Sequence, residues 1–498
     1  MPKRKVSKIV QEEIEHLVPA SEAEIKKPSP SKRQKIKEEP QAVAGSPSTK
    51  KRVSAPRATK QKPKVEPDIE AEEERTTSPT QAKKRTKKQV KAENGVEGEE
   101  EEEEKKKVVR KRKTKEEKEA EAMPFAARTT GHKLFLGAHI SSAGGVQNAV
   151  GNAVQIGANA FAVFLKSQRK WANPPLTDDQ CSSFHANCRT QSYEQGKYVV
   201  PHGSYLVNMA HTDKDRTEQA YTSYLDDLKR CERLGISLYN IHPGNTVSND
   251  RAEAIAHLAD NINRAHAETS TVITLLENMA GGGNVLGSTF EDLRDIIELV
   301  SNKDRIGVCI DTCHTFAGGY DLRTPAAFKE TFDKFEDVVG FKYLRAMHIN
   351  DSKAPFDSHR DLHANIGTGF LGLRAFHTLV NDSRFWGMPL ILETPITIID
   401  DDGVPVKDEK GKEKEDRIVD ATEIKLMESL LGMDIESEEF LSLEKQLSRK
   451  GEPERKRLTE QQDRKREKEA AKKAKAGSKR KGAKKASSED DESEPLSD

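Results

Sequence analysis

The sequence RIGVCIDTCH, residues 305–314, places a short, continuous apolar run directly before two possible metal ligands, Asp311 and His314. Such a run, without alternation of polar and apolar residues, is typical of a parallel strand that is covered on both faces. Seven further runs of this kind occur in the central part of the chain. They lie at 133–140, 158–165, 197–202, 237–244, 271–279, 343–351 and 388–394.

Segments with helical periodicity separate these runs, for example TSYLDDLKRCERLG at 222–235 and FEDLRDIIELV at 290–300. Strands that alternate with helices indicate a parallel sheet. Eight such units match the size of a (β/α)₈ barrel, and RIVDATEIKLMESLLGM at 417–433 predicts the helix that closes the ring. We therefore predict an α/β protein of the TIM-barrel class over residues 131–435.

The charges are sorted along the 498 residues, although the formal net charge is zero. Residues 1–130 carry a net charge of +9 and residues 441–498 one of +5, whereas residues 131–440 carry −14. The two ends are rich in Lys, Glu, Pro and Ser and cannot bury enough apolar surface to offset their ordering entropy. We predict that 1–130 and 436–498 are disordered tails, and that any helix within 441–470 has no face to bury.

The sequence contains no apolar run long enough for a transmembrane helix, and its five cysteines do not suggest a disulfide scaffold. Because the first residues, MPKRKVSKIVQEE, include no apolar stretch, we expect no secretory signal. We expect a soluble protein of a reducing compartment. Basic clusters at 2–6, 83–88, 105–113 and 479–485 fit nuclear import receptors or the nucleic-acid backbone. We expect a nuclear protein, and a mitochondrial fraction is left open.

Most of the predicted strands end on a side chain that can bind a metal ion. In a parallel barrel the carboxyl ends of all strands lie on one face, so these groups should converge. The strand-end residues are His139, His202, His242, Glu277, Asp311, His348 and Glu393. His314, Asp361 and His363 follow shortly after strand ends. The second run is the exception, because it continues into KSQRKW at 166–171.

Each of these residues also has an ordinary structural interpretation. A single His at a strand end is usually a hydrogen-bonded core residue, and a single Asp is often a helix cap. Separate structural explanations for all of them become improbable together. A mixture of His and carboxylates favours Zn²⁺, Mn²⁺ or Fe over Mg²⁺. We do not expect Cys309 or Cys313 to be ligands.

Two glycine-rich segments need separate interpretation. GTGFLG at 367–372 has the spacing of a dinucleotide fingerprint, but it does not follow the first strand of a βαβ unit and no acidic residue closes the pattern. We predict that it is a loop. AGGGNVLG at 280–287 is likewise predicted to be a flexible loop between a strand and a helix.

Nine motifs follow one another along residues 133–395 and together resemble the endonuclease IV family of abasic-site endonucleases, in a eukaryotic form with added tails. They are GAHISSAGG (137–145), FLKSQRKW (164–171), PHGSYLVN (201–208), NIHPG (240–244), LLENMAGGGNVLG (275–287), GVCIDTCHTFAGGYDLR (307–323), KYLRAMHINDSK (342–353), DLHANIGTG (361–369) and LILET (390–394). The resemblance is expected to extend through the helix that ends near residue 433.

The resemblance implies a trinuclear zinc cluster at the carboxyl-terminal mouth of the barrel, with Mn²⁺ or Fe left open at some positions. His202 and His242 would bind one ion, and Glu277 would bridge it to a second and act in catalysis. The second ion would be completed by Asp311, His348 and Glu393, and the third would be held by His314, Asp361 and His363. His139 is similar to a family residue behind the ligands and is not counted as one.

The implied reaction is incision 5′ to an abasic site, which leaves a 3′-hydroxyl and a 5′-deoxyribose phosphate, together with removal of blocked 3′ ends. A missing base offers no edge to read, so recognition should depend on the easy deformation of the unstacked site. Arg169, Tyr205 and Leu206 lie in motifs that resemble the DNA-penetrating loops of the family. We expect a monomer that binds double-stranded DNA, with tails that add backbone contacts but no chemistry.

One segment departs from the short bacterial connection: IIDDDGVPVKDEKGKEKED at 398–416 is long and charged. It should lie on the catalytic side, either as a DNA contact or, as we favour, as a tolerated surface insertion. Two other functions stay open, a sugar isomerase or epimerase on the same barrel and a chromatin-binding protein with an inactive barrel. The third ligand set and the motifs around Arg169 and Tyr205 argue against the first. The presence of all nine ligands argues against the second.

Overall fold

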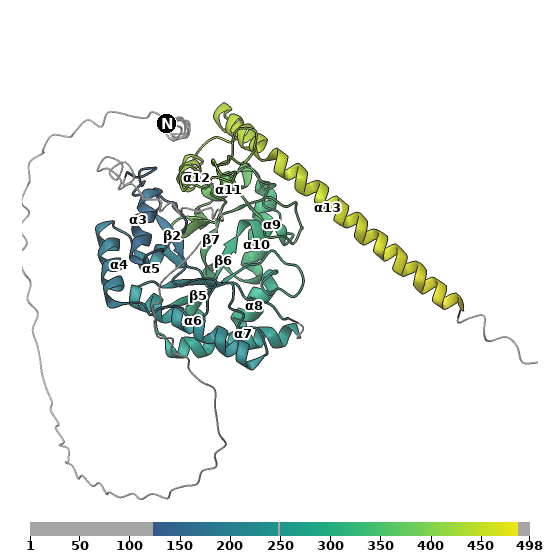
Figure 1. The fold of residues 1–498 in the computed structure, drawn as a ribbon, viewed down its shortest axis with the longest axis horizontal. Coiled ribbons are helices and arrows are strands. Elements are labelled where there is room, and N and C mark those ends of the chain that lie inside the picture. Colours follow the sequence, from purple (N-terminus) through teal and green to yellow (C-terminus); the bar gives the residue numbers. More distant parts are fainter. Residues whose placement is uncertain (1–122, 248–249, 487–498) are drawn as a thin grey trace, which may run out of the picture. The chain divides into compact units, whose positions relative to one another are not determined.

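The computed structural model describes residues 123–247 and 250–486, with the backbone alone from 469 onward. Eight parallel strands lie at the centre, and each coincides with one of the predicted runs (Figure 1). They are β1 (Phe135–Ile140), β2 (Ala160–Val163), β3 (Val199–Pro201), β4 (Leu238–Ile241), β5 (Ile273–Glu277), β6 (Ile306–Asp311), β7 (Leu344–His348) and β10 (Pro389–Leu392). The predicted α/β barrel class is confirmed.

The strands form one sheet in the order β3-β2-β1-β10-β7-β6-β5-β4, and every pair in it is parallel. The two edge strands meet at a parallel bridge between His202 and Asn240. There the Gly203 amide donates to the Asn240 carbonyl over 2.8 Å. The ring of strands therefore closes at the position of one predicted ligand, His202.

Helices between the strands form the outer layer (Figure 1). Several begin where a side chain caps the first turn, as at Thr177, Asp213, Asp250, Thr289 and Thr324. The longer helices are α3 (Gln147–Gln155), α4 (Asp178–Thr190), α6 (Lys214–Leu234), α7 (Arg251–Glu268), α8 (Phe290–Leu299), α10 (Pro325–Val338), α11 (Leu373–Asn381) and α12 (Ile418–Ser429). The short ones are α5 (Gln195–Tyr198), α9 (Thr312–Ala317), η1 (Lys303–Arg305), η2 (Phe341–Tyr343) and η3 (Ser383–Phe385). The helix predicted at 417–433 is present as α12.

The main core lies between the strands and the helices, where large side chains such as Phe161, Phe184, Tyr224 and Phe290 are fully buried. A smaller cluster consists of strand residues alone, on the face of the sheet away from the helices. Its members are Val200, Leu238, Leu275, Cys309 and Ala346, with Ile273 packed beside them. Cys309 is therefore a packing residue of the barrel interior.

The folded domain begins before residue 131. Phe125 packs against the main core and its amide donates to the Gln155 carbonyl over 2.7 Å. The Arg128 guanidinium lies 3.8 Å from the centre of the Tyr193 ring. The predicted boundary was therefore several residues too late, and the rest of the predicted amino-terminal tail, 1–122, lies outside the described residues.

The predicted tail at 436–498 differs most from the structure. Helix α13 (Glu438–Ala486) begins there, with Phe440 fully buried and Leu458 only 1% exposed. Leu443 and Leu447 are partly buried against the core. The predictions of disorder and of a helix without a buried face are wrong for this packed part. Phe440, Leu443 and Leu447 have the i, i+3, i+7 spacing of a buried helical face, but this short stripe is outweighed by the strongly charged composition of the segment. Residues 487–498 lie outside the described part.

The glycine-rich segment 367–372 is a loop, as predicted, and a buried carboxylate explains its conformation. Asp351 lies in β8 (Asp351–Ser352), which pairs in antiparallel fashion with β9 (His363–Ala364). Its oxygens accept hydrogen bonds from the amides of Gly369 (2.8 Å), Leu371 (2.9 Å) and Gly372 (3.3 Å). The backbone donors that would hold a nucleotide phosphate are thus already used. Residues 280–287 also form a loop.

The insertion at 398–416 forms a small antiparallel meander, with bridges between Ile399 and Pro405 and between Lys407 and Glu413. It packs on α13, because a side chain at Gly403 would collide with the Lys450 carbonyl oxygen. Asp402 also lies 3.5 Å from Arg449. The insertion therefore has a structural partner that the sequence did not suggest. Among the described residues, no helix is long and apolar enough to span a membrane.

We predict that Asp351→Asn lowers the free energy of unfolding by about 2–4 kcal/mol, because an amide group would replace an oxygen that accepts two buried N–H groups. The measurement is a urea titration, in which the midpoint should fall while the slope stays unchanged. The matched control is Asp260→Asn on α7, where the side chain is exposed. Equal stability of the two variants would contradict a structural role for Asp351.

Candidate metal centre

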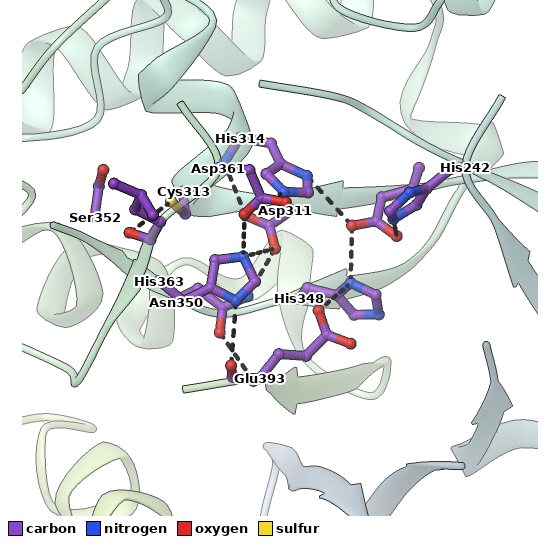
Figure 2. Close-up of polar contacts among 12 residues, drawn as sticks. His242, Asp311, Cys313, His314, His348, Asn350, Ser352, Asp361, His363 and Glu393 are labelled. Carbon is purple, nitrogen blue, oxygen red and sulfur yellow. Dashed lines mark hydrogen bonds and ion pairs between the residues drawn. The ribbon is translucent and has the colours of Figure 1, made fainter. Parts of the chain in front are cut away.

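The barrel brings all nine predicted ligands to one mouth. Figure 2 shows this site, with labels on several of the ligands, such as His242, Asp311 and Glu393. Strand alternation explains this, because side chains two residues apart point to the same face. Several ligands follow an interior-facing residue by two positions, as Glu277 follows Leu275 and Asp311 follows Cys309. The ligands thus form the last layer of the barrel interior.

The buried carboxylate of Glu277 lies at the centre of the site. Its Oε2 atom lies 3.2 Å from His202 Nε2 and 3.4 Å from His242 Nε2. Its Oε1 atom lies 3.1 Å from His348 Nδ1 and 3.3 Å from His314 Nδ1. The two oxygens therefore face two different pairs of imidazoles, which is the geometry expected of a bridging ligand.

Two compact groups share this carboxylate. One consists of His202, His242 and Glu277, and all of its ligand atoms lie within 4.8 Å of one another. The other consists of Glu277, Asp311, His348 and Glu393, by the same measure. Within it, His348 Nδ1 lies 3.2 Å from a Glu393 oxygen. These groups have the same members as the first two ligand sets implied by the resemblance.

The third set also comes together, beside the second. Asp361 Oδ1 lies 3.2 Å from His314 Nε2 and 3.1 Å from His363 Nε2. His363 Nε2 lies 3.6 Å from an oxygen of Asp311, so Asp311 stands between the second and third sets. Asp361 is half exposed, whereas His314 is buried. Figure 2 shows His314, Asp361 and His363 facing one another.

Cys313 lies close to Asp361 and His363 and could in principle join this group. Its sulfur donates to the Leu362 carbonyl over 3.6 Å. Burial raises the pKa of the Cys313 thiol to about 12, which favours the neutral form over the thiolate that binds metals. The nitrogen and oxygen donors therefore describe the site better than the sulfur does.

The acidic side chains of this donor set favour positive charge on the imidazoles beside them. Burial opposes a charge on His363, but Asp311 and Asp361 outweigh it and raise its pKa to about 9. Burial likewise opposes a charge on His314 and His348. Asp311 and Asp361 nevertheless raise the pKa of His314, and Cys309 and Glu393 raise that of His348, both well above the usual range. Protons on these imidazoles balance the carboxylates. A mixed set of this kind fits borderline divalent cations such as zinc.

His139 lies behind this set and is in none of the compact groups. Its ring centre lies 6.3 Å from that of His202 and 4.4 Å from that of Phe164. Burial and then the charge of His202 hold its pKa well below the usual range, so the ring is neutral.

Three buried asparagines that we did not predict hold the ligands in place. Asn240 donates to Glu277 Oε2 over 2.6 Å. Asn278 accepts from the Asp311 amide over 2.7 Å. Asn350 donates to Asp311 over 2.6 Å and accepts from the Glu393 amide over 2.8 Å. The available signal was an Asn one or two residues from a ligand in NIHPG, LLEN and HIND.

The residues predicted to contact DNA lie on loops beside the metal centre. Tyr205 is 58% exposed and its ring centre lies 5.3 Å from that of His202. Leu206 and Arg169 are also exposed. The two loops are joined, because the Ser204 hydroxyl donates to the Gln168 carbonyl over 3.0 Å.

Not every polar side chain after the second strand faces the mouth. Lys166 is buried against α6, with its amine 3.1 Å from Asp226 and 3.4 Å from Asp227. Two side chains close to these loops were not singled out by the sequence reasoning. Trp171 is exposed on the Arg169 loop, and Arg417 lines a pocket next to Tyr205 and Glu393. Arg417 donates to the His139 carbonyl over 2.7 Å.

The sequence of this chain is similar to a known protein family and to several named relatives. Residues 150–415 match the family described as xylose isomerase-like TIM barrel. The chain is 48% identical over 272 residues to apurinic-apyrimidinic endonuclease 1 of Saccharomyces cerevisiae, covering 55% of this chain and 74% of the relative. It is 53% identical over 240 residues to the protein of the same name from Schizosaccharomyces pombe, and the match covers 48% of this chain and 70% of that relative.

A bacterial relative shows the same likeness. The chain is 45% identical over 261 residues to the probable endonuclease 4 of Campylobacter curvus, covering 52% of this chain and 92% of that protein. The chain is therefore a xylose isomerase-like TIM barrel, and within that class it belongs to the endonuclease IV family of abasic-site endonucleases. The family resemblance seen in the nine motifs is confirmed.

We predict that zinc binding to the metal-free protein at pH 7 releases protons, because the pKa values of the imidazoles of His314, His348 and His363 are raised above their usual range. A proton on an imidazole competes with the metal, so affinity should fall as the pH is lowered and rise toward pH 9, where His363 loses its proton. Calorimetry in buffers of different ionisation enthalpy measures the release. A His211→Ala variant is the control, because His211 lies outside the centre. Binding without proton release would contradict this description.

Proposed function

We propose that this protein is a zinc-dependent endonuclease of base excision repair that hydrolyses the phosphodiester bond 5′ to an abasic site. The products would be a 3′-hydroxyl and a 5′-deoxyribose phosphate, and the same site would remove blocked 3′ ends. The observation that carries this proposal is the buried Glu277 carboxylate, whose two oxygens face separate groups of ligands. Membership of the endonuclease IV family supports the substrate.

His202, His242 and Glu277 would hold one ion, and Glu277 with Asp311, His348 and Glu393 a second. The third would lie among His314, Asp361 and His363, with Asp311 close by. Zinc ions supply Lewis-acid stabilisation of the charge that develops on the phosphate, and they ease the loss of a proton from water.

The protein's own residues set up the geometry of the reaction. Burial alone would raise the pKa of Glu277, but His348 and His242 hold it well below its usual range, so the group is ionised. An ionised bridging carboxylate keeps the two ligand groups at a fixed separation and can orient the attacking water. Asn350 links Asp311 to Glu393 and thereby maintains the spacing of the second group.

The exposed side chains at the mouth fit a substrate that lacks a base. Tyr205 and Leu206 offer apolar surface that can enter the gap in the base stack, and Arg169 can contact the adjacent backbone. A site without stacking bends and opens at low cost, so this insertion discriminates against intact duplex. The substrate is therefore double-stranded DNA with abasic sites or blocked 3′ ends.

The remaining proposals concern the cellular setting. A nuclear location, with import receptors that bind the basic clusters, fits the sequence of the two ends. We propose that the protein acts as a monomer, because a single chain supplies all nine ligands of the metal centre. The alternative of a sugar isomerase or epimerase does not use the third ligand group or the apolar loops at the mouth.

We expect the purified protein to contain about three zinc ions and to incise an abasic duplex. Chelation should lower the rate by more than about 100-fold, because the charge-stabilising groups are removed, and added zinc should restore it. Metal analysis together with incision of a labelled duplex checks both. Full activity of the chelated, metal-free protein would contradict the proposal.

Replacement of the loop side chains should impair recognition without removing the metals. For Tyr205→Ala and Leu206→Ala we expect the preference for abasic over intact duplex to fall by about 10-fold each, as for loss of one stacking contact. The control is Leu299→Ala, an exposed leucine of similar type at the end of α8. Loss of zinc from the Tyr205 variant would show that this residue has a structural role instead.

A further inference from the structure

Helix α13 is attached to the barrel next to the metal centre. Its first turn is anchored by the fully buried Phe440, whose ring packs edge-on against that of His377 at 5.2 Å. One turn further on, Glu444 accepts from Arg374 of α11 over 2.8 Å. The helix therefore leaves the body of the barrel from a fixed starting point on α11.

The next two turns lie directly on the loop that follows His363. A side chain at Gly367 would meet Leu447 of α13 at 2.9 Å. The contact at Gly451 is closer still, since a Cβ there would lie 1.7 Å from the Thr368 carbonyl oxygen. Arg455 donates to this same carbonyl. A glycine is required at 451 because the helix backbone itself touches the loop.

The contact continues toward the other end of the same segment. Leu458 is 1% exposed. Gln461 accepts a hydrogen bond from Arg360 over 3.2 Å, and Arg360 directly precedes Asp361. Helix α13 thus contacts the segment 360–369 near both of its ends, at Arg360 and at Thr368.

This segment carries two of the nine ligands, Asp361 and His363, on a connection rather than on a barrel strand. Asp361 is half exposed, and His314 and His363 are the partners of its carboxylate. The strand-end ligands, by contrast, are held by the sheet and by the buried asparagines. Asp361 and His363 therefore depend on contacts outside the barrel strands, namely the β8–β9 pairing and the contacts with α13.

We propose that residues 440–461 of α13 are a positioning element of the metal centre, which fixes segment 360–369 and with it Asp361 and His363. This inference rests on the proposed function, because it concerns the third metal ion of that site. It also revises the expectation that the carboxyl-terminal segment contributes only contacts with DNA. Loss of the contact between α13 and segment 360–369 should weaken the binding of one of the three metal ions and leave the other two bound.

The test uses two variants of the full chain and two matched controls. Gly451→Leu forces a side chain against the Thr368 carbonyl, and Arg455→Ala removes the hydrogen bond to it. Glu452→Leu and Arg449→Ala make the same changes at exposed positions of the same helix. Zinc content after dialysis, the kcat and KM of incision, and the thermal unfolding midpoint are measured for each protein.

We expect Gly451→Leu and Arg455→Ala to lose one zinc ion and about 10-fold or more in kcat, in the range seen when residues that orient metal ligands are replaced. Both controls should keep wild-type values. If Gly451→Leu does not fold, Arg455→Ala decides, since it only removes atoms. Folded variants that keep three zinc ions and the wild-type kcat overturn the inference, as does a rise in KM alone, which would indicate a DNA contact.

The two proposals fail in different ways. A wild-type protein that binds no zinc and does not incise abasic DNA overturns the proposed function. A wild-type protein with three zinc ions and normal incision, accompanied by unaffected Gly451→Leu and Arg455→Ala variants, overturns only the positioning role of α13.

Discussion

The structure of the site depends on one buried carboxylate that is surrounded by imidazoles. Glu277 is fully buried at the end of β5, and the imidazoles of four histidines from four other parts of the chain approach its two oxygens. A charge in this position is tolerated only because protons on the imidazoles, or bound cations, balance it. The same carboxylate connects two ligand groups, so the electrostatic requirement of burial and the geometric requirement of the chemistry are met by one residue.

The barrel makes this arrangement possible through alternation along the strands. The residues that fill the interior, such as Leu275, Cys309 and Ala346, are followed two positions later by Glu277, Asp311 and His348. The apolar layers thus support a polar layer above them, and the buried asparagines join neighbouring ligands within it. In the third ligand group, His314 shares this support through the Asn278 carbonyl, whereas Asp361 and His363 lie on a connection that pairs with β8 and is also held from outside by α13. Helix α13, which lies outside the ring of strands, is therefore in contact with the segment that carries two of the ligands.

Much of this could be predicted because it depends on local patterns. Each strand is a continuous apolar run, and each ligand stands at a fixed distance from the end of its run, so the eight strands and the meeting of the nine residues followed from parallel-barrel geometry. The interpretation of GTGFLG as a loop also held, but its cause, the buried Asp351, lies 16 residues before Gly367 and leaves no local signal. For Lys166 the local pattern was misleading. This cation follows a strand end as the ligands do, but its side chain points away from the mouth of the barrel and pairs with Asp226 and Asp227.

The sequence by itself determined the barrel, the face on which the ligands gather and the family, because strand length, side-chain alternation and motif order are all written in consecutive residues. Only the tertiary structure decided where the folded domain begins and ends. Phe440 and Leu458 stand in strongly charged surroundings that give no average signal of burial, and Phe125 stands alone in a short segment without apolar periodicity. Their burial depends on surfaces contributed by distant parts of the chain, and such a match between two surfaces cannot be read from either segment alone.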